Sequence, residues 1–267
     1  MLFCFSPKRR SLLLATLIVF WASTAALAQD LTVMSSGAFA PAYRALVPQF
    51  EKHTHTHVTS KWGPSMGTTS GAIPMRLSRK ESADVVIMAR SELDNLARKG
   101  LILEGSQVDL VRSRIGMAVK AGATVPDIST VPAFRHALLQ ASTIAYSDSA
   151  SGVYIASELY KRLGLEKELA PKSRQIPAEP VGLVVSRGEA EIGFQQMSEL
   201  KPIPGITLVG PIPNELQKIT VFAAGVVASS KHPGAARALI RFLSSSAQCP
   251  VIEESALEPV ACTRATN

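Results

Sequence analysis

Apolar residues along this chain follow two alternating patterns. Short continuous apolar runs, typical of buried strands, are followed by stretches in which apolar residues recur every three or four positions, as on one face of a helix. Such runs, together with the more polar segments 58–62 and 191–196, predict strands at 31–34, 58–62, 83–88, 115–119, 143–146, 191–196 and 219–228. The helical stretches start near positions 39, 73, 92, 131, 153, 181 and 233. This alternation predicts an α/β protein with parallel sheets, which bind ligands at the carboxyl ends of their strands.

Three loops at predicted strand ends are rich in serine, threonine and glycine, at 35–38, 63–71 and within 145–155. Each leads into a predicted helix, so its free backbone N–H groups and the positive end of the helix dipole favour an anion. One such loop alone is more simply an ordinary capped turn, but three of them favour an anion-binding site. In the last loop, Ser151 can cap the helix and Gly164 can end it.

Two further strand ends carry polar side chains. Arg90 follows the strand at 83–88 and opens the next helix. Its guanidinium could clamp a carboxylate through two hydrogen bonds or could be a solvated surface charge, and both interpretations stay open. The strand at 191–196 ends on two amides, Gln195 and Gln196.

Two motifs suggest other chemistry, and both are weak. His53, His55 and His57 would share one face of an extended segment, but no acid or cysteine accompanies them, so a solvated edge is favoured over a metal site. The segment 63–67 matches G-x-S-x-G, the pattern of a hydrolase nucleophile. Only two predicted strands precede it and no oxyanion-hole motif is visible, so a hydrolase is disfavoured.

Residues 1–28 have the features of a secretory signal. A basic cluster at 8–10 precedes an apolar run at 12–22, and the segment 26–28 matches a small-x-small cleavage site. No later stretch approaches the roughly 20 apolar residues of a transmembrane helix. The mature protein is therefore expected to be exported to the periplasm as a soluble chain that begins at Gln29.

Charge and cysteine content exclude some partners. Three of the 28 basic residues leave with the signal, and the remaining 25 against 21 acidic residues give a net charge of +4. The basic residues form no cluster, so neither nucleic acid nor a membrane surface is indicated as a partner. Cys249 and Cys262 enter an oxidising compartment, where they could form a disulfide or stay as two free thiols.

The mature length allows two lobes. We expect 29–110 and 217–267 to form the first lobe and 113–211 to form the second, with the chain crossing between them twice.

Four segments along the chain together resemble a known family. They are, in order, L-T-V-M-S-S-G, A-D-V-V-I-M-A, A-Y-S-D-S-A-S-G-V-Y and V-V-S-R-G-E-A-E-I-G-F. Their order is similar to that in the periplasmic solute-binding proteins of the molybdate-binding ModA family. The resemblance implies a type II periplasmic-binding-protein fold, in which a hinge joins two lobes around an anion cleft. By position it implies ligand contacts at Ser36, Gly37, Ala38, Ser65, Ala89, Ser151, Gly152 and Val153.

The departures from that family favour a ligand larger than molybdate. Ala38 stands where these proteins usually have serine, the loop at 63–71 is longer, and Gln196 falls near their binding tyrosine. Arg90 takes the place of an acidic or polar residue. A di- or tricarboxylate met by Arg90, Gln196 and the additional hydroxyls fits these changes better.

Two functions follow from the resemblance. The first is a monomeric solute receptor that delivers a small anion to an inner-membrane ABC permease. The alternative rests on a resemblance of this divergent branch to periplasmic aconitate isomerases, which move a proton on a tricarboxylate without metal or cofactor. Such an enzyme needs a base near the cleft. Four residues are candidates and none is singled out, namely Asp148, Glu199, Tyr146 and Tyr154.

Overall fold

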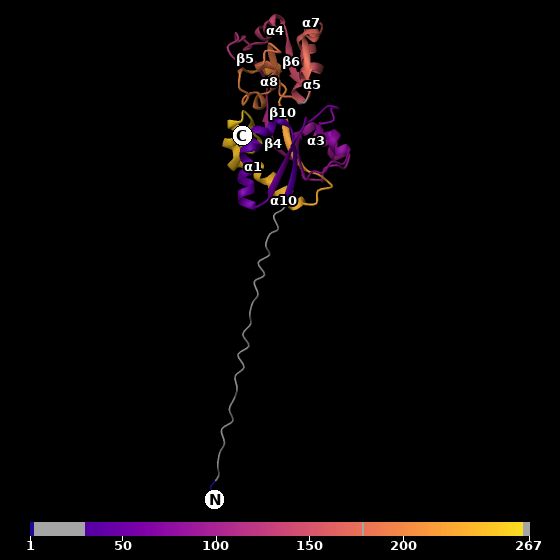
Figure 1. The fold of residues 1–267 in the computed structure, drawn as a ribbon, viewed down its shortest axis with the longest axis vertical. Helices are drawn as coiled ribbons and strands as arrows, with labels where there is room; N and C mark the ends of the chain where they lie inside the picture. Colours follow the sequence, from indigo (N-terminus) through magenta and orange to yellow (C-terminus); the bar gives the residue numbers. More distant parts are fainter. Residues whose placement is uncertain (3–29, 178, 264–267) are drawn as a thin grey trace.

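The computed structural model describes residues 1–2, 30–177 and 179–263 (Figure 1). The expected signal at 1–28 falls almost entirely outside these ranges. Within the described residues, no helix has both the length and the hydropathy needed to cross a bilayer. The chain forms two sheets, one above the other in Figure 1, and we call the parts built around them lobe 1 and lobe 2.

Lobe 1 contains a six-stranded mixed sheet in the order β11-β4-β10-β3-β1-β2. β1 runs parallel to both β2 and β3, whereas β10 runs antiparallel to β3 and β4, and β11 antiparallel to β4. The strands are β1 (Asp30–Ser35), β2 (His57–Trp62), β3 (Val85–Ala89), β4 (Val108–Ser113), β10 (Thr220–Val226) and β11 (Glu258–Pro259). The helices are α1 (Ala40–Thr54), α2 (Ile73–Ser78), α3 (Arg90–Arg98), α10 (Pro233–Leu243), α11 (Cys249–Glu254) and α12 (Val260–Thr263).

Lobe 2 contains a five-stranded mixed sheet in the order β7-β6-β8-β5-β9. β6 runs parallel to β7 and β8, and β5 runs antiparallel to β8 and β9. The strands are β5 (Ile115–Lys120), β6 (Ile144–Ser147), β7 (Ser173–Ile176), β8 (Ile192–Gln196) and β9 (Ile206–Pro211). The helices are α4 (Val131–Gln140), α5 (Ala150–Tyr154), α6 (Tyr160–Leu163), α7 (Glu166–Leu169), α8 (Val181–Ser186) and α9 (Met197–Leu200).

The α/β class with two lobes is confirmed, but the sheets are mixed and not wholly parallel. Helices connect the neighbouring parallel strands β1 and β2, and β6 and β7, as the alternating pattern predicts. β5 follows β4 after the single residue Arg114, and β10 follows β9 with only a short 3-10 turn between them. These two connections carry the chain from one lobe to the other, so they do not form a helical crossover within one sheet.

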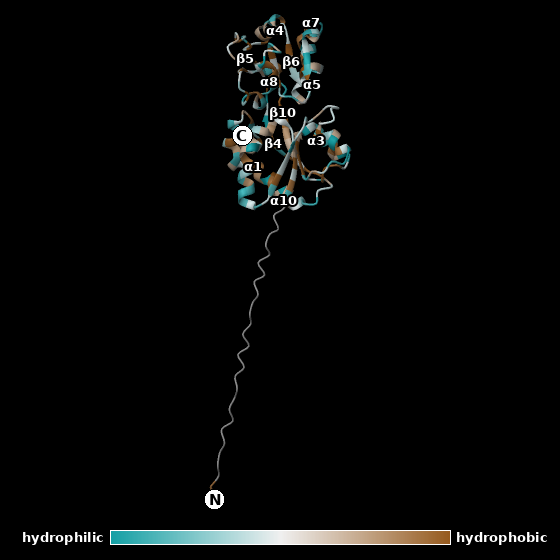
Figure 2. Ribbon diagram, viewed as in Figure 1, coloured by the Kyte–Doolittle hydropathy of each residue, from teal (hydrophilic) through white to brown (hydrophobic). Residues whose placement is uncertain are grey.

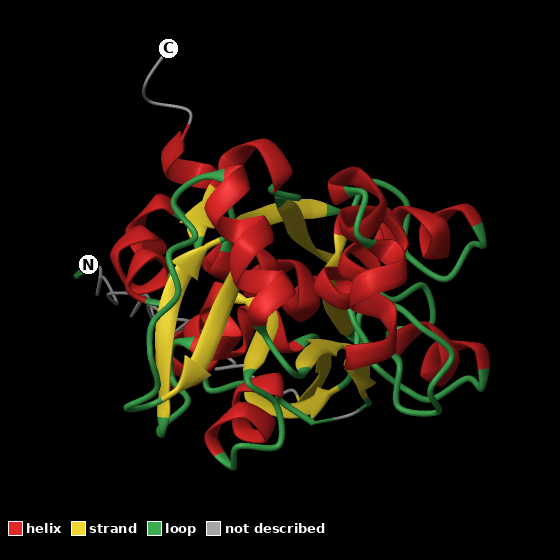
Figure 3. Cartoon of the chain, turned by 90° about the horizontal axis from the view of Figure 1, so that it is seen from above, coloured by secondary structure: helices red, strands yellow, loops and turns green. Residues whose placement is uncertain are grey.

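Alternating side chains of each central strand pack on opposite faces of the lobe 1 sheet. In β3, Val85 and Ile87 join the core under α1 and α10, while Val86 and Met88 join the core under α2 and α3. Both faces are therefore covered, which explains why the strand reads as one continuous apolar run. Figure 3 shows helices around the strands. In Figure 2, the helical stretch between the labels α5 and α7 is largely hydrophilic.

The helix that follows β6 starts earlier than predicted. It begins at Ala150 with Ser149 at the N-cap position, continues through a π-helical segment at Ile155–Leu159, and ends at Gly164 in the left-handed conformation. The role of Gly164 is confirmed. The N-cap prediction for Ser151 is wrong, because Ser151 lies inside the first turn and its hydroxyl is 2.9 Å from that of Ser147.

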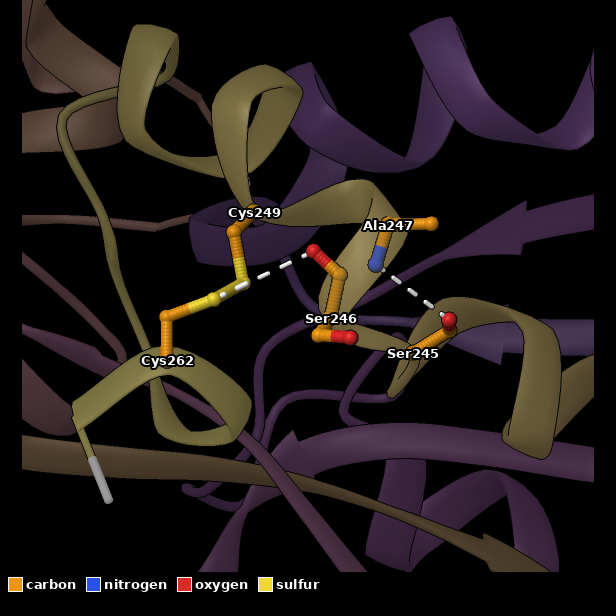
Figure 4. The surroundings of a disulfide bond; sticks show 5 residues. All are labelled: Ser245, Ser246, Ala247, Cys249 and Cys262. Carbon is orange, nitrogen blue, oxygen red and sulfur yellow. Dashed lines mark hydrogen bonds between the residues drawn. A yellow bond between two sulfur atoms is a disulfide. The ribbon is translucent and has the colours of Figure 1, made fainter. Parts of the chain in front are cut away.

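A disulfide joins Cys249 to Cys262, so the alternative of two free thiols does not hold (Figure 4). The bond links the start of α11 to α12 across a sequence separation of 13 residues. It therefore attaches the last described helix to lobe 1.

Candidate functional site

A hollow of about 290 Å³ lies between the two lobes, and we call it the cleft. Lobe 1 contributes the turn after β1, one side of α1 and the loop between β2 and α2. Lobe 2 contributes the loop after β6, the start of α8 and the end of β8. The lining residues are Gly37, Ala40, Arg44, Trp62, Gly63, Pro64, Gly71, Ser147, Asp148, Ser149, Glu179, Pro180, Gln195 and Glu199.

Direct hydrogen bonds join the lobes on both sides of the cleft. The backbone N–H of Ser65 donates to Oγ of Ser149 at 3.2 Å. The Ser198 hydroxyl donates to the carbonyl oxygen of Ala38 at 2.7 Å. The lobes are thus in contact around the cleft, as in a closed binding protein.

Glu199 is the carboxyl group that lobe 2 places against lobe 1. It lies in the first turn of α9, directly after β8, and its side chain occupies the space beside Gly37. A methyl group on Gly37 would overlap Oε1 of Glu199, so glycine at this position leaves room for the carboxyl group. Glycine at position 37 therefore lets the Glu199 carboxyl group take this position against lobe 1.

The environment of Glu199 raises its pKa from 4.5 to about 7. Burial is the largest cause, because it disfavours the charged form, and the charge of Asp148 acts in the same direction. Hydrogen bonds from the Gln195 side chain and the Gln196 backbone oppose this effect. A carboxyl group with a pKa near neutrality can both take up and release a proton at physiological pH.

Arg44 supplies positive charge to the same cleft. Its guanidinium lies 4.8 Å from the centre of the Trp62 ring, and Trp62 packs edge-on against Tyr43. Among the described residues, Arg44 forms no ion pair. The aromatic ring orients the guanidinium through a cation–π contact and leaves its N–H groups available for a carboxylate.

A second hollow of about 370 Å³ also lies between the lobes. It is lined by Met66, Ala89, Arg90, Ser91, Ala150, Val153, Tyr154, Glu158, Lys218, Ile219, Thr220 and Val221. Arg90 is held here by two carboxylates, since its Nε donates to Asp94 at 2.8 Å and its Nη1 to Asp109 at 2.6 Å. This pairing raises the pKa of Arg90 and occupies the side chain within lobe 1. A larger hollow of about 580 Å³ has only lobe 2 residues in its lining.

The ten residues that the sequence predicts as ligand contacts do not all line the same hollow. Gly37 lines the cleft, whereas Ala89, Arg90 and Val153 line the second hollow. Six line neither hollow, namely Ser36, Ala38, Ser65, Ser151, Gly152 and Gln196.

These six residues form the framework around the cleft. Ser65 accepts a hydrogen bond from the N–H of Ala89 at 3.0 Å, and the N–H of Ser36 donates to Ile87 at 2.9 Å. Gly152 packs so closely on the backbone of Ser147 that a side chain there would clash. The backbone groups expected to hold an anion are in these cases used to fix the loops.

The four candidate bases also divide between the two hollows. Asp148 and Glu199 line the cleft, and Tyr154 lines the second hollow, where its hydroxyl donates to the carbonyl of Leu216 at 2.5 Å. Tyr146 packs against the core of lobe 2. Arg44 and Trp62 were not anticipated from the sequence, because an exposed arginine on a helix has no distinctive pattern.

The other two motifs have structural roles. His53 lies next to the carbonyl of Gln49, and His57 lies 3.1 Å from Glu51. Within the described ranges, no group of three or more metal-binding side chains is suitably arranged for an ion. Ser65 of the G-x-S-x-G segment is fully buried between two backbone segments, which does not match an exposed nucleophile.

Comparison with known proteins adds three similarities. An aconitate isomerase from Pseudomonas sp is 48% identical over 258 residues, which cover 95% of this chain and 98% of that protein. The periplasmic molybdate-binding protein of Azotobacter vinelandii superposes with a TM-score of 0.65 at 20% identity, covering 85% of this chain and 98% of that one. A sulfate-binding protein from Mycobacterium tuberculosis gives a TM-score of 0.64 at 15% identity, covering 88% of each chain.

These similarities agree with the resemblance read from the sequence. The two solved structures share the fold of this chain at low identity. The model of bacterial extracellular solute-binding proteins matches residues 31–255. The chain belongs to the bacterial extracellular solute-binding protein family.

Proposed function

We propose that this protein is an aconitate isomerase that interconverts trans- and cis-aconitate in the cleft between its lobes. The observation that carries the proposal is the carboxyl group of Glu199, which faces the cleft with a pKa of about 7. A solute receptor needs groups that bind an anion, but it does not need a group tuned to exchange a proton at neutral pH.

The reaction is a proton shift between two carbons. Glu199 in its ionised form takes a proton from the methylene carbon of the substrate, and the electron pair spreads over an allylic carbanion. The protonated Glu199 then returns a proton to the former vinyl carbon, and the double bond moves to the other side of the central carbon. No electrons enter or leave the substrate, so the same group serves as base and then as acid.

The carbanion needs positive charge nearby. Arg44 lines the same cleft and is the cation that would pair with a substrate carboxylate. A guanidinium held before the reaction stabilises the charge that develops on the carboxylate-conjugated carbanion, without reorganisation during the step. Asp148 and Glu179, which also line the cleft, disfavour a carboxylate placed at the lobe 2 side.

The related protein supports the same function. It is an aconitate isomerase, and its similarity to this chain extends over nearly the whole length of both. The family to which the chain belongs supports a second candidate, a receptor that binds a small anion and passes it to an ABC permease. For either function we propose an exported, monomeric protein that works in the periplasm after removal of residues 1–28.

Turnover of trans-aconitate separates these two functions. The mature protein is incubated with trans-aconitate in heavy water, and the vinyl and methylene protons are followed by NMR. We expect conversion to cis-aconitate, with some deuterium entering both carbons. In the Glu199→Gln variant, kcat should fall by about a hundredfold or more, the range for loss of a general acid–base group.

Glu166→Gln is the matched control, since Glu166 is exposed on α7 of the same lobe. This variant should retain wild-type turnover. If calorimetry detects binding of trans-aconitate to the wild-type protein but NMR detects neither conversion nor exchange, the isomerase proposal is wrong and the receptor function remains.

A further inference from the structure

We propose that Gln195 is a positioning residue that holds the carboxyl group of Glu199 in place for proton transfer. This inference rests on the proposed isomerase function. It concerns how one amide fixes both the orientation and the ionisation of the proton-carrying group.

Gln195 is buried at the end of β8, with 5% of its surface exposed. Its Oε1 accepts a hydrogen bond from the backbone N–H of Val181 at 2.9 Å. Its Nε2 donates to Oε1 of Glu199 at 3.0 Å. The amide therefore connects the first residue of α8 to the carboxyl group in the first turn of α9.

The orientation of this amide follows from its partners. A backbone N–H can only donate, so the oxygen of Gln195 must face Val181. The NH₂ group must then face Glu199 and can act toward it only as a donor. An amide does not titrate, so this donor is present in every protonation state of Glu199.

A fixed donor favours the ionised form of Glu199. It opposes burial and the charge of Asp148, both of which raise the pKa of Glu199. The other charged groups that line the cleft are Arg44 and Glu179. Without Gln195, Glu199 would remain protonated to higher pH and could not begin the reaction as a base.

The adjacent residue provides a control within the same strand. Gln196 points to the opposite face of β8, as successive strand residues do, and its Nε2 lies 3.4 Å from Oγ1 of Thr220. Its side chain has no hydrogen bond to the carboxyl group of Glu199. Of these two neighbouring glutamines of equal size, Gln195 is the one whose side chain donates a hydrogen bond to Glu199.

The test is a titration of Glu199 in the substrate-free mature protein. Glutamate is labelled with ¹³C at its carboxyl carbon, and the Glu199 signal is identified by its loss in Glu199→Gln. In Gln195→Leu the titration midpoint should rise by about one pH unit or more, the size expected for loss of a hydrogen bond to a charged group. In Gln196→Leu it should stay at the wild-type value.

Kinetics provide the second readout. The lower-pH limb of the kcat profile should shift upward in Gln195→Leu together with the titration midpoint, and kcat at its plateau should fall by about tenfold or more because the carboxyl group is less well held. Gln195→Met removes the donor to Glu199 without adding a charge and should shift the midpoint in the same direction. It serves as the test if Gln195→Leu does not fold by circular dichroism.

An unshifted midpoint in the folded Gln195 variant would overturn the proposal. An equal shift in Gln196→Leu would also overturn it. Because the titration uses no substrate, it is independent of turnover. A wild-type protein that does not convert trans-aconitate, but whose Glu199 titration still depends on Gln195, would contradict the isomerase function while supporting the coupling of the two side chains.

Discussion

The cleft and the second hollow lie side by side between the same two lobes, yet they present their charges differently. The contact between Ser65 and Ser149 separates them, with Pro64 lining the cleft and Met66 the second hollow. In the second hollow, Arg90 is held by two aspartates of its own lobe. In the cleft, Arg44 is free of ion pairs among the described residues.

This difference shows when an arginine side chain is available to bind a carboxylate ligand. An arginine at the end of a strand and the start of a helix matches the general position of an anion site. Such a residue is not available to a ligand when neighbouring carboxylates already satisfy its guanidinium. An aromatic ring can orient an arginine without neutralising it, so Arg44 on Trp62 is better suited to meet a carboxylate than Arg90.

The largest effect on this comparison is expected from Gly37→Ala. The new methyl group would overlap the carboxyl group of Glu199, which must then turn away or keep the lobes apart. Either response misplaces the proton-carrying group, and we expect kcat/KM for trans-aconitate to fall by about a hundredfold. The free energy of unfolding should change little, because the end of a glutamate side chain can move at small cost.

Gly234→Ala is the control for this change. A Cβ at Gly234 meets open space in α10 of lobe 1, so turnover should stay at the wild-type level. Wild-type kcat/KM in Gly37→Ala would mean that the fit of Glu199 against lobe 1 is not needed for catalysis.

A smaller effect is expected when the two arginines are compared directly. In a Glu199→Gln background, in which turnover is slowed, Arg44→Gln should weaken trans-aconitate binding about tenfold to a hundredfold, the range for a hydrogen bond to a charged group. Arg90→Gln should weaken it much less, because Arg90 is already paired with Asp94 and Asp109. Isothermal calorimetry gives both dissociation constants, and equal losses would place the carboxylate at the second hollow as well.

Much of the fold could be predicted because hydrophobic periodicity records burial. β3 is apolar throughout since helices cover both faces of its sheet, and the helix after β6 ends at Gly164 as its position indicates. The antiparallel strands could not be predicted in the same way. Their direction depends on which lobe the chain enters after Arg114. Hydrophobic periodicity within a strand does not predict the direction of that strand in the sheet.

The candidate site was less predictable, because a site is defined by which groups remain unpaired. Ser65 and Ala89 each follow a predicted strand end, and in the structure the N–H of Ala89 donates to the hydroxyl of Ser65. Glu199 was one of four candidate bases, and it is distinguished by its position against Gly37 and by its pKa of about 7. That contact joins residues more than 160 positions apart, across two lobes, and no local pattern reports it.

The smallest effect concerns the stability of the substrate-free protein. It tests whether ionisation of Glu199 in the cleft lowers the free energy of unfolding. The unfolded carboxyl group has a pKa near 4.5, whereas folded Glu199 has a pKa of about 7, so between these values the folded state binds more protons. Stability from this group is therefore greatest below pH 4.5 and is lost as the pH rises through 7. Glu199→Gln should gain stability relative to wild type between pH 5 and pH 8, on the order of 1 kcal/mol because Glu199 is partly exposed. Urea unfolding at pH 5 and at pH 8 gives the difference in free energy of unfolding between Glu199→Gln and wild type. If this difference is the same at both pH values, Glu199 is no harder to ionise in the cleft than in water.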